Sequence, residues 1–269
     1  MITDDEITLL LNDLFELYGY DFTSYSAASL KRRVLRLYSM DKFPSFAEFR
    51  YKLRNDTSYL KRFVEEITVN VTEMFRDPHF YKALRTNILP MIGTKPFIRI
   101  WHAGCSTGEE VYSMAIMLRE TNLLHKSLIY ATDLNPSVVD KAKQGFFPLT
   151  QMKQYSENYI ESGGSNDFSA YYTANYGQAK FHDELSEKII FSTHNLVSDS
   201  SFNEFDLILC RNVLIYFDKD LQERVFKLFD QSLSPLGFLA LGSKETLKFS
   251  SVQSRFKQLD KEKIWQRTS

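Results

Sequence analysis

The sequence predicts an α/β fold with a mainly parallel sheet, preceded by an all-helical N-terminal domain. Two observations carry this prediction. Residues 1–92 repeat apolar side chains at three- and four-residue steps and hold only one glycine, Gly19. From Phe97 onward, short apolar runs typical of buried strands alternate with helical patterns. Residues 146–187 interrupt this alternation and are too long for an ordinary connection, so we expect them to form an insert.

Composition limits the class of protein. The chain has 269 residues, 25% of them charged, with a net charge of −1, which argues against general nucleic-acid binding. Its start is acidic and no apolar run approaches a membrane span, so we expect a cytoplasmic protein without membrane insertion. Neither Cys105 nor Cys210 lies in a metal-ligand spacing, which favours reduced thiols and no metal site. We expect a monomer.

The N-terminal domain is predicted to contain four helices before residue 68. Apolar residues from Ile7 to Leu17 share one helical face, and Thr3 with Glu6 is a plausible capping box. The other three helices are predicted at residues 25–39, 45–54 and 57–67.

The second of these helices is basic. Arg32 and Arg36 lie opposite its apolar face, and Lys31 and Arg33 flank them. Such a cluster is commonly a solvated face. The alternative is a landing surface for an acidic partner, because the planar guanidinium grips carboxylates with two hydrogen bonds.

The next unit is strand, turn and helix. After a helix at residues 78–91, the apolar run 97–101 leads into a turn of small residues, 103–108, and a helical segment, 111–118. This arrangement presents backbone N–H groups and a helix N-terminus to a ligand, but it can also be a tight connection only. The glycine spacing differs from the dinucleotide fingerprint G-x-G-x-x-G.

Asp133 closes the second predicted strand, residues 127–132. An acid at this place accepts hydrogen bonds from ribose hydroxyls in nucleotide-binding sheets. The alternative role is the N-cap of the helix predicted at residues 136–143.

The rest of the chain resumes the alternation after the insert. Within the insert we predict a helix near residues 151–162, a small antiparallel sheet, and an irregular stretch from Ser165 to Gly177. The remaining predictions are a helix at 219–233, a turn at 234–237, and strands at 188–193, 205–210, 238–241 and 263–267.

Two motifs resemble one known family. Residues 105–113 read Cys-Ser-Thr-Gly-Glu-Glu-x-Tyr-Ser, and residues 210–217 read Cys-Arg-Asn-Val-x-Ile-Tyr-Phe. With residues 67–76 and 131–133, they resemble the CheR-type chemoreceptor glutamate methyltransferases. The resemblance implies a Rossmann-like class I S-adenosylmethionine (SAM) methyltransferase domain over 93–269, with a β-subdomain inserted at 146–187. It also implies a helical domain over 1–92 that docks the receptor.

The resemblance further implies a set of site residues. Tyr216 matches the family's active-site tyrosine, and we expect Arg76 and Tyr216 to orient the carboxylate or the cofactor. Arg32, Arg33 and Arg36 are the expected docking residues. Met74 and His102 depart from the family pattern. The family's cofactor contacts fall on Asn70, Thr72, Arg76, Glu109, Asp133, Asn195, Leu196, Arg211 and Asn212.

The function implied is protein-glutamate O-methylation in chemosensory signal transduction, with S-adenosylhomocysteine (SAH) as product and the cytoplasmic domain of methyl-accepting chemoreceptors as partner. The alternatives are a SAM-binding regulatory module without turnover, a nucleic-acid methyltransferase and a nucleotide-dependent oxidoreductase. Because residues 165–177 look too irregular to offer a docking edge, we expect the receptor to be found through the N-terminal domain rather than through a tether on the insert.

Overall fold

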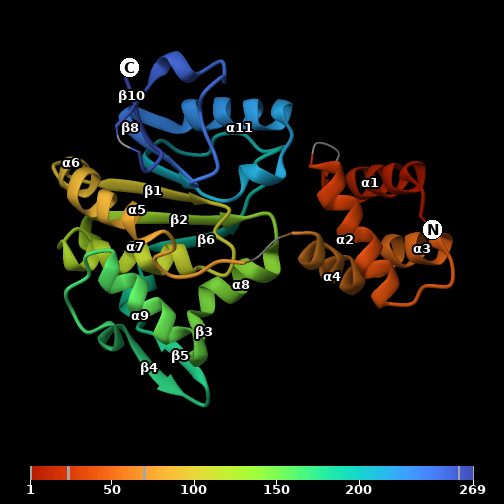
Figure 1. Cartoon of the computed structure of the whole chain (residues 1–269), viewed down its shortest axis with the longest axis horizontal. Coiled ribbons are helices and arrows are strands. Elements are labelled where there is room, and N and C mark those ends of the chain that lie inside the picture. Colours follow the sequence, from red (N-terminus) through yellow and green to blue (C-terminus); the bar gives the residue numbers. More distant parts are fainter. Residues whose placement is uncertain (1, 23–24, 69–70, 260, 269) are drawn as a thin grey trace.

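The computed structural model describes residues 2–22, 25–68, 71–259 and 261–268. Figure 1 shows a helical domain beside a larger domain built on a sheet. In the described residues the helical domain contains α1 (Asp4–Tyr18), α2 (Ala27–Met40), α3 (Phe46–Asn55) and α4 (Thr57–Ile67). These helices enclose one apolar core around Leu10, Val34 and Phe63.

Helix α1 begins and ends at the residues that local signals select. The hydroxyl of Thr3 accepts from the Glu6 N–H (3.2 Å), and the Glu6 carboxylate accepts from the Thr3 N–H (2.8 Å), so the predicted capping box is confirmed. Gly19 ends the helix with φ +73°, a conformation that glycine adopts without steric cost.

The helix predicted over residues 78–91 is not continuous. It is divided into α5 (Pro78–Ala83), a π-helical turn (Leu84–Ile88) and α6 (Leu89–Ile92). Pro90 explains the break, because its nitrogen cannot donate within a helix and its ring crowds the carbonyl four residues earlier.

The larger domain is built on a seven-stranded sheet in the described part of the chain. The strand order is β6-β2-β1-β7-β8-β10-β9, with β6 to β8 parallel and β10 antiparallel to both of its neighbours. The strands are β1 (Ile98–Ala103), β2 (Ser127–Asp133), β6 (Ile189–Thr193), β7 (Phe205–Cys210), β8 (Leu233–Leu241), β9 (Phe256–Gln258) and β10 (Ile264–Arg267).

Helices cover both faces of this sheet. Helix α7 (Glu109–Glu120), with α5 and α6, packs on the face that carries Leu207 and Leu209. Helix α11 (Lys219–Ser232) packs on the face that carries Ile208 and Cys210. Strand β7 is buried on both faces, as its mostly apolar run predicts. Helix α8 (Pro136–Gln144) follows β2.

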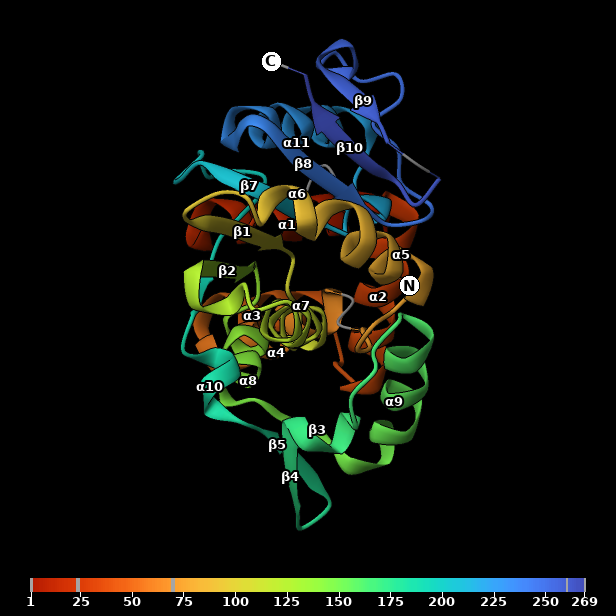
Figure 2. The same ribbon diagram turned by 90° about the vertical axis from the view of Figure 1, so that its left-hand side faces the viewer.

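The insert contains a second, smaller sheet. Strands β3 (Phe146–Pro148), β5 (Gln178–Phe181) and β4 (Tyr172–Asn175) pair antiparallel in that order, and α9 (Met152–Glu161) and α10 (Asp183–Ser186) flank them. Figures 1 and 2 both show this sheet at the far end of the domain. The expectation of an irregular stretch up to Gly177 is wrong at its end, because β4 pairs in register with β5 and Gly177 lies in the turn between them.

Glu120, at the C-terminal end of α7, joins the insert to the main domain. Its carboxylate accepts from the hydroxyls of Tyr159 and Tyr171 and pairs with Arg85 at 2.6 Å. The Asn166 amide is a further donor at 3.3 Å. Donors from the insert and from the π-helical turn therefore converge on one carboxylate.

Two other details differ from the predictions. Strand β8 begins at Leu233, the last residue of the predicted helix, and includes the predicted turn 234–237, because Leu233 pairs with Phe205 before an irregularity in the ladder. Strand β9 was not predicted. No helix in the described ranges is long and apolar enough to cross a membrane.

Candidate active site

The turn after β1 is fixed to the end of β2. The N–H groups of Gly104 and Cys105 both donate to the Thr132 carbonyl at 2.8 Å, and the Ser106 N–H donates to the Asp133 carboxylate at 2.8 Å. Gly104 has φ +88°, and a Cβ placed there would lie 2.5 Å from a methyl of Val213. The loop therefore requires glycine at this position for conformation and for space.

Asp133 does not cap the next helix. Asn135 is the N-cap of α8 and accepts from the Ser137 N–H at 3.0 Å, so the capping interpretation of Asp133 is wrong. The Asp133 carboxylate accepts instead from the N–H groups of Ser106 and Asn135. Burial raises its pKa, and these hydrogen bonds oppose the shift.

The turn after β7 is held by a buried carboxylate. Glu245 accepts from the N–H groups of Gly242 (2.6 Å), Asn212 (3.0 Å) and Ile215 (3.3 Å). Asn212 has φ +61°, which asparagine tolerates better than most residues. Burial raises the pKa of Glu245. The arrangement fixes the short helical turn that carries Tyr216.

Arg211 joins the ends of several elements beneath the site. Its guanidinium pairs with Glu110 (3.1 Å) and Asp77 (2.6 Å), donates to the Arg76 carbonyl (3.2 Å), and lies 3.9 Å from the centre of the Phe80 ring. The side chain is only 2% exposed.

His102 completes this group. Its Nδ1 lies 2.9 Å from the other oxygen of the Glu110 carboxylate. Burial alone would raise the pKa of Glu110, but the His102 hydrogen bond and the Arg211 charge hold it below its ordinary value. Glu110 therefore remains ionised under the site.

The segment 71–77 supplies Arg76. Phe75 and Asp77, on either side of it, both have positive φ (52° and 58°), which is uncommon for residues other than glycine. The backbone is held there because the Phe75 N–H donates to the Ser113 hydroxyl at 2.9 Å and the Met74 carbonyl accepts from Asn158 at 3.0 Å.

These elements surround one open pocket between the two domains, with about 1140 Å³ of space counting the solvent at its mouth. The predicted site residues that line it are Arg33, Thr72, Arg76, Asp133, Asn195, Leu196, Arg211, Asn212 and Tyr216.

Three predicted residues that the structure describes are not brought to this pocket. Glu109 is buried with its carboxylate on the Thr107 hydroxyl (2.6 Å), and its neighbour Glu110 lines the pocket instead. Arg32 and Arg36 are exposed on α2. Asn70 lies outside the described residues.

The sequence analysis missed the contribution of the segment around the start of α2. Tyr25, Ser26 and Ser29 line the pocket together with Arg33. Small polar residues before a helix suggest only a cap, so no local signal indicated that this segment reaches the catalytic domain.

The pocket is suited to a polar ligand. Within the described ranges, four buried polar atoms of its lining residues have no hydrogen-bond partner: Arg33 Nε, Ser106 Oγ, His194 Nδ1 and Arg211 Nε. Buried polar atoms of this kind are normally hydrogen-bonded. The same ranges contain no group of three or more His, Cys, Asp or Glu that could hold a metal ion.

Comparison with known proteins agrees with this geometry. Residues 5–68 match the family described as "CheR methyltransferase, all-alpha domain", and residues 70–264 match "CheR methyltransferase, SAM binding domain". A "Putative methyltransferase Cher3" of Pseudomonas putida is 47% identical over 259 residues, covering 96% of this chain and 95% of that protein. A "Chemotaxis protein methyltransferase" of Listeria monocytogenes is 32% identical over 236 residues, covering 85% of each.

The pocket fits the cofactor of this family. SAM carries ribose hydroxyls and an amino-acid group, and the pocket offers the Asp133 carboxylate, the backbone turn 103–108 and unpartnered polar atoms at the carboxyl ends of parallel strands. The cofactor is SAM, the product is SAH, and the chain is a methyltransferase. With both domains matched over nearly its whole length, the chain belongs to the CheR methyltransferase family.

Proposed function

We propose that this protein transfers the methyl group of SAM to glutamate side chains in the cytoplasmic domains of chemoreceptors. The Listeria relative is named a chemotaxis protein methyltransferase, which supports this substrate class. On this proposal the protein works in the cytoplasm as a monomer, without nucleic acid. Residues 1–92 dock the receptor and link to the catalytic domain. Residues 93–269 form the domain that transfers the methyl group, and residues 146–187 form its inserted subdomain.

The observation that carries the proposal is the grouping of Arg33, Arg76 and Tyr216 in one pocket with Asp133. Burial raises the pKa of Tyr216, and the charges of Arg33 and Arg76 act on its hydroxyl in the opposite direction. Two guanidinium groups near a neutral phenol form a seat for a carboxylate, because both cations attract it and the phenol can donate a hydrogen bond to it.

The reaction needs orientation more than proton transfer. SAM supplies a methyl group on a sulfonium: the glutamate oxygen forms the new C–O bond, the C–S bond breaks, and its electron pair leaves on sulfur. A glutamate carboxylate is already ionised near neutral pH, so no general base is required. Arg76 and Tyr216 are assigned the role of aligning the carboxylate and limiting its access to water.

The remaining site residues divide by their surroundings. We assign cofactor contacts to Thr72, Asp133, Asn195, Leu196 and Asn212, which line the pocket. Arg211 lines it too, but both terminal nitrogens of its guanidinium already bond protein partners, so we assign it a positioning role. Contacts of Asn70 and Glu109 with the cofactor stay predictions.

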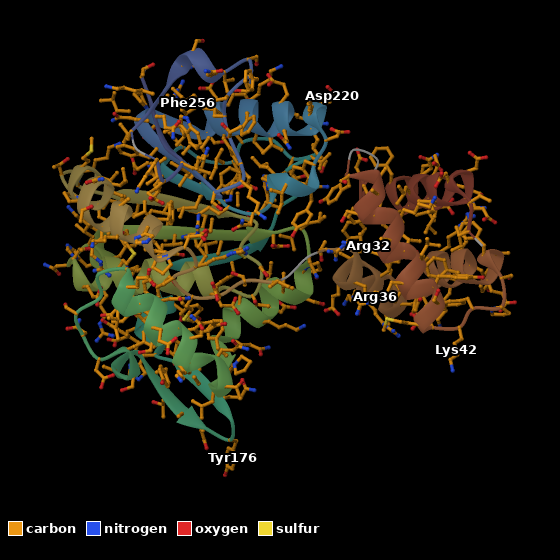
Figure 3. All side chains as sticks on the ribbon, viewed as in Figure 1. Arg32, Arg36, Lys42, Tyr176, Asp220 and Phe256 are labelled. Carbon is orange, nitrogen blue, oxygen red and sulfur yellow. The ribbon has the colours of Figure 1, made fainter. Side chains whose placement is uncertain are left out.

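Receptor docking is assigned to Arg32 and Arg36. Figure 3 shows both along α2, on the side of the helical domain nearer the catalytic domain, and Lys42 at the outer edge. Reversal of both arginines to glutamate should raise KM for receptor while sparing the Kd for SAH, and wild-type KM should rise with salt because exposed charges are screened over about 10 Å at 0.1 M. Lys42→Glu is the matched control. A normal, salt-insensitive KM in the double variant would refute docking on this face.

The proposed reaction is tested by incubating the purified protein with tritiated-methyl SAM and membranes that contain chemoreceptors. Methyl esters hydrolyse in mild alkali, whereas N-methyl groups do not, so the label should be released as volatile methanol. A receptor whose methylated glutamates are changed to alanine is the control and should take up no label. Alkali-stable label, or none on any receptor, would refute the proposal.

A further inference from the structure

Tyr25 connects the cores of the two domains. Its ring packs edge-on against Phe22 (5.1 Å between ring centres, 73° between planes) and against Phe217 (5.0 Å, 68°). Phe22 belongs to the core of the helical domain and Phe217 to the core under α11. The side chain therefore forms part of the contact between the domains.

The backbone around Tyr25 makes the same connection. Tyr25 and Phe217 form an antiparallel bridge, and the Ser26 N–H donates to the Tyr216 carbonyl at 2.8 Å. The short turn that carries Tyr216 is thus hydrogen-bonded directly to the start of α2. Any change in how the helical domain is seated would move this turn.

Tyr25 is also part of the pocket wall. It lines the pocket together with Asp133 and Leu134, and Leu134 packs against the core of the helical domain. Burial raises the pKa of the Tyr25 hydroxyl, and the carboxylates of Asp133 and Asp21 add to the shift. The phenol is consequently a neutral donor close to Asp133 at any physiological pH.

The Tyr25 hydroxyl has no hydrogen-bond partner on the protein within residues 2–22, 25–68, 71–259 and 261–268. A tyrosine packed on two aromatic rings normally finds a partner for its O–H group. The Asp133 oxygens already accept the N–H groups of Ser106 and Asn135. Tyr25 and Asp133 line the same pocket, so a nucleoside whose ribose Asp133 held would lie in the pocket that Tyr25 lines.

We propose that Tyr25 is a cofactor-positioning residue supplied by the helical domain: its hydroxyl binds the adenosine part of SAM, and cofactor binding thereby tightens the contact between the two domains. This inference rests on the proposed use of the pocket and deepens it. The coupling is reciprocal by thermodynamic necessity: if the seated helical domain strengthens SAM binding, SAM strengthens the seating by the same factor.

Calorimetric titration of the full chain with SAH and with methylthioadenosine tests the first half of the proposal. Methylthioadenosine keeps the adenosine and lacks the amino-acid group. Tyr25→Phe retains both ring contacts and loses only the hydroxyl, so Kd should rise about threefold to tenfold, the loss of one hydrogen bond, and by the same factor for both ligands.

Tyr20→Phe is the matched control. Tyr20 lies in the same segment, stacks on Phe22 at 6.0 Å and does not line the pocket, so both affinities should be unchanged. Unchanged affinity in Tyr25→Phe, or a loss for SAH alone, overturns the role of Tyr25. Failure of the wild-type protein to bind SAH at all would instead overturn the proposed function.

Hydrogen exchange tests the coupling by a readout independent of turnover. Saturating SAH should slow exchange in peptides covering residues 25–34 several-fold in the wild-type protein, because the Ser26 N–H is bonded to the catalytic domain. The slowing should be smaller in Tyr25→Phe at equal saturation. Exchange in these peptides that does not respond to SAH in the wild type would refute the coupling.

Discussion

Replacing Arg211 by methionine removes the cation that holds Glu110, Asp77 and the Arg76 carbonyl together. The Arg211 side chain is 2% exposed and that of Glu110 is 17% exposed, whereas that of Asp77 is 41% exposed. Loss of one partner from a buried ion pair costs about 3–5 kcal/mol, because the other charge stays buried without compensation. Water can reach Asp77, so most of the cost comes from Glu110. We therefore expect a loss of about 3 kcal/mol in the free energy of unfolding.

Urea unfolding of four proteins measures this value: wild type, Arg211→Met, Glu110→Gln and the double variant. Neutral glutamine leaves no buried charge, so the double variant should be more stable than the sum of the single losses predicts, by about 1–3 kcal/mol. Lys31→Met is the control, since Lys31 pairs with Asp4 on the surface and should contribute less than about 1 kcal/mol. A loss below about 1 kcal/mol in Arg211→Met, or strict additivity, would refute the reasoning.

The ion pair between Glu110 and Arg211 also predicts how the stability of the protein depends on pH. The pKa of Glu110 is lower in the folded protein than its ordinary value. The stability that this carboxylate contributes is therefore fully present above the ordinary glutamate pKa, and is lost as the pH falls through the folded-state value. Arg211→Met should lose less stability than the wild type over that acid range. Equal losses of stability in the two proteins would show that Arg211 does not lower the pKa of Glu110.

Three further measurements test the site and the insert. Tyr216→Phe should lower methyl transfer far more than it changes the Kd for SAH, and equal small effects would make Tyr216 a packing residue only. Gly104→Ala should weaken SAH binding at least about tenfold, because the added Cβ meets Val213 at 2.5 Å, whereas Gly177→Ala, with nothing within 4 Å, should leave binding unchanged. A receptor C-terminal pentapeptide should not bind at micromolar concentration; binding that is lost on shortening residues 163–180 would refute docking through the helical domain alone.

The sequence predicted those helices and strands whose bounds are set by nearby residues, such as helix caps and apolar runs. The bounds of β7 follow from a run that is apolar except for Asp206, and those of α1 follow from Thr3, Glu6 and Gly19. Strand β4 has a mostly exposed, polar pattern without alternation, so its pairing with β5 depends on the turn at Gly177 and on Phe181 beneath it. Strand β9 has three residues, and its pairing with β10 defines it.

The site residues also divide into those that local sequence marks and those that only tertiary packing places. The turn after β1 and Asp133 could be predicted because strand ends and glycine spacing mark them in the sequence. Two adjacent acids, Glu109 and Glu110, could not be told apart, since the phase of α7 decides which one faces the pocket. Tyr25 lies far from the catalytic motifs in the sequence, and only the packing of one domain on the other brings it to the pocket.

The carboxylate of Glu120 has a consequence for protein engineering. The insert is anchored through Tyr159, Tyr171 and Asn166 to this one side chain, which belongs to a helix of the main domain. A chimera that exchanged residues 146–187 for a foreign subdomain would leave the acid and Arg85 facing a surface that no longer supplies its hydroxyls. A chimera joined at residues 146 and 187 would therefore lose the hydrogen bonds between the insert and Glu120. The exchanged segment should be designed together with the C-terminal end of α7.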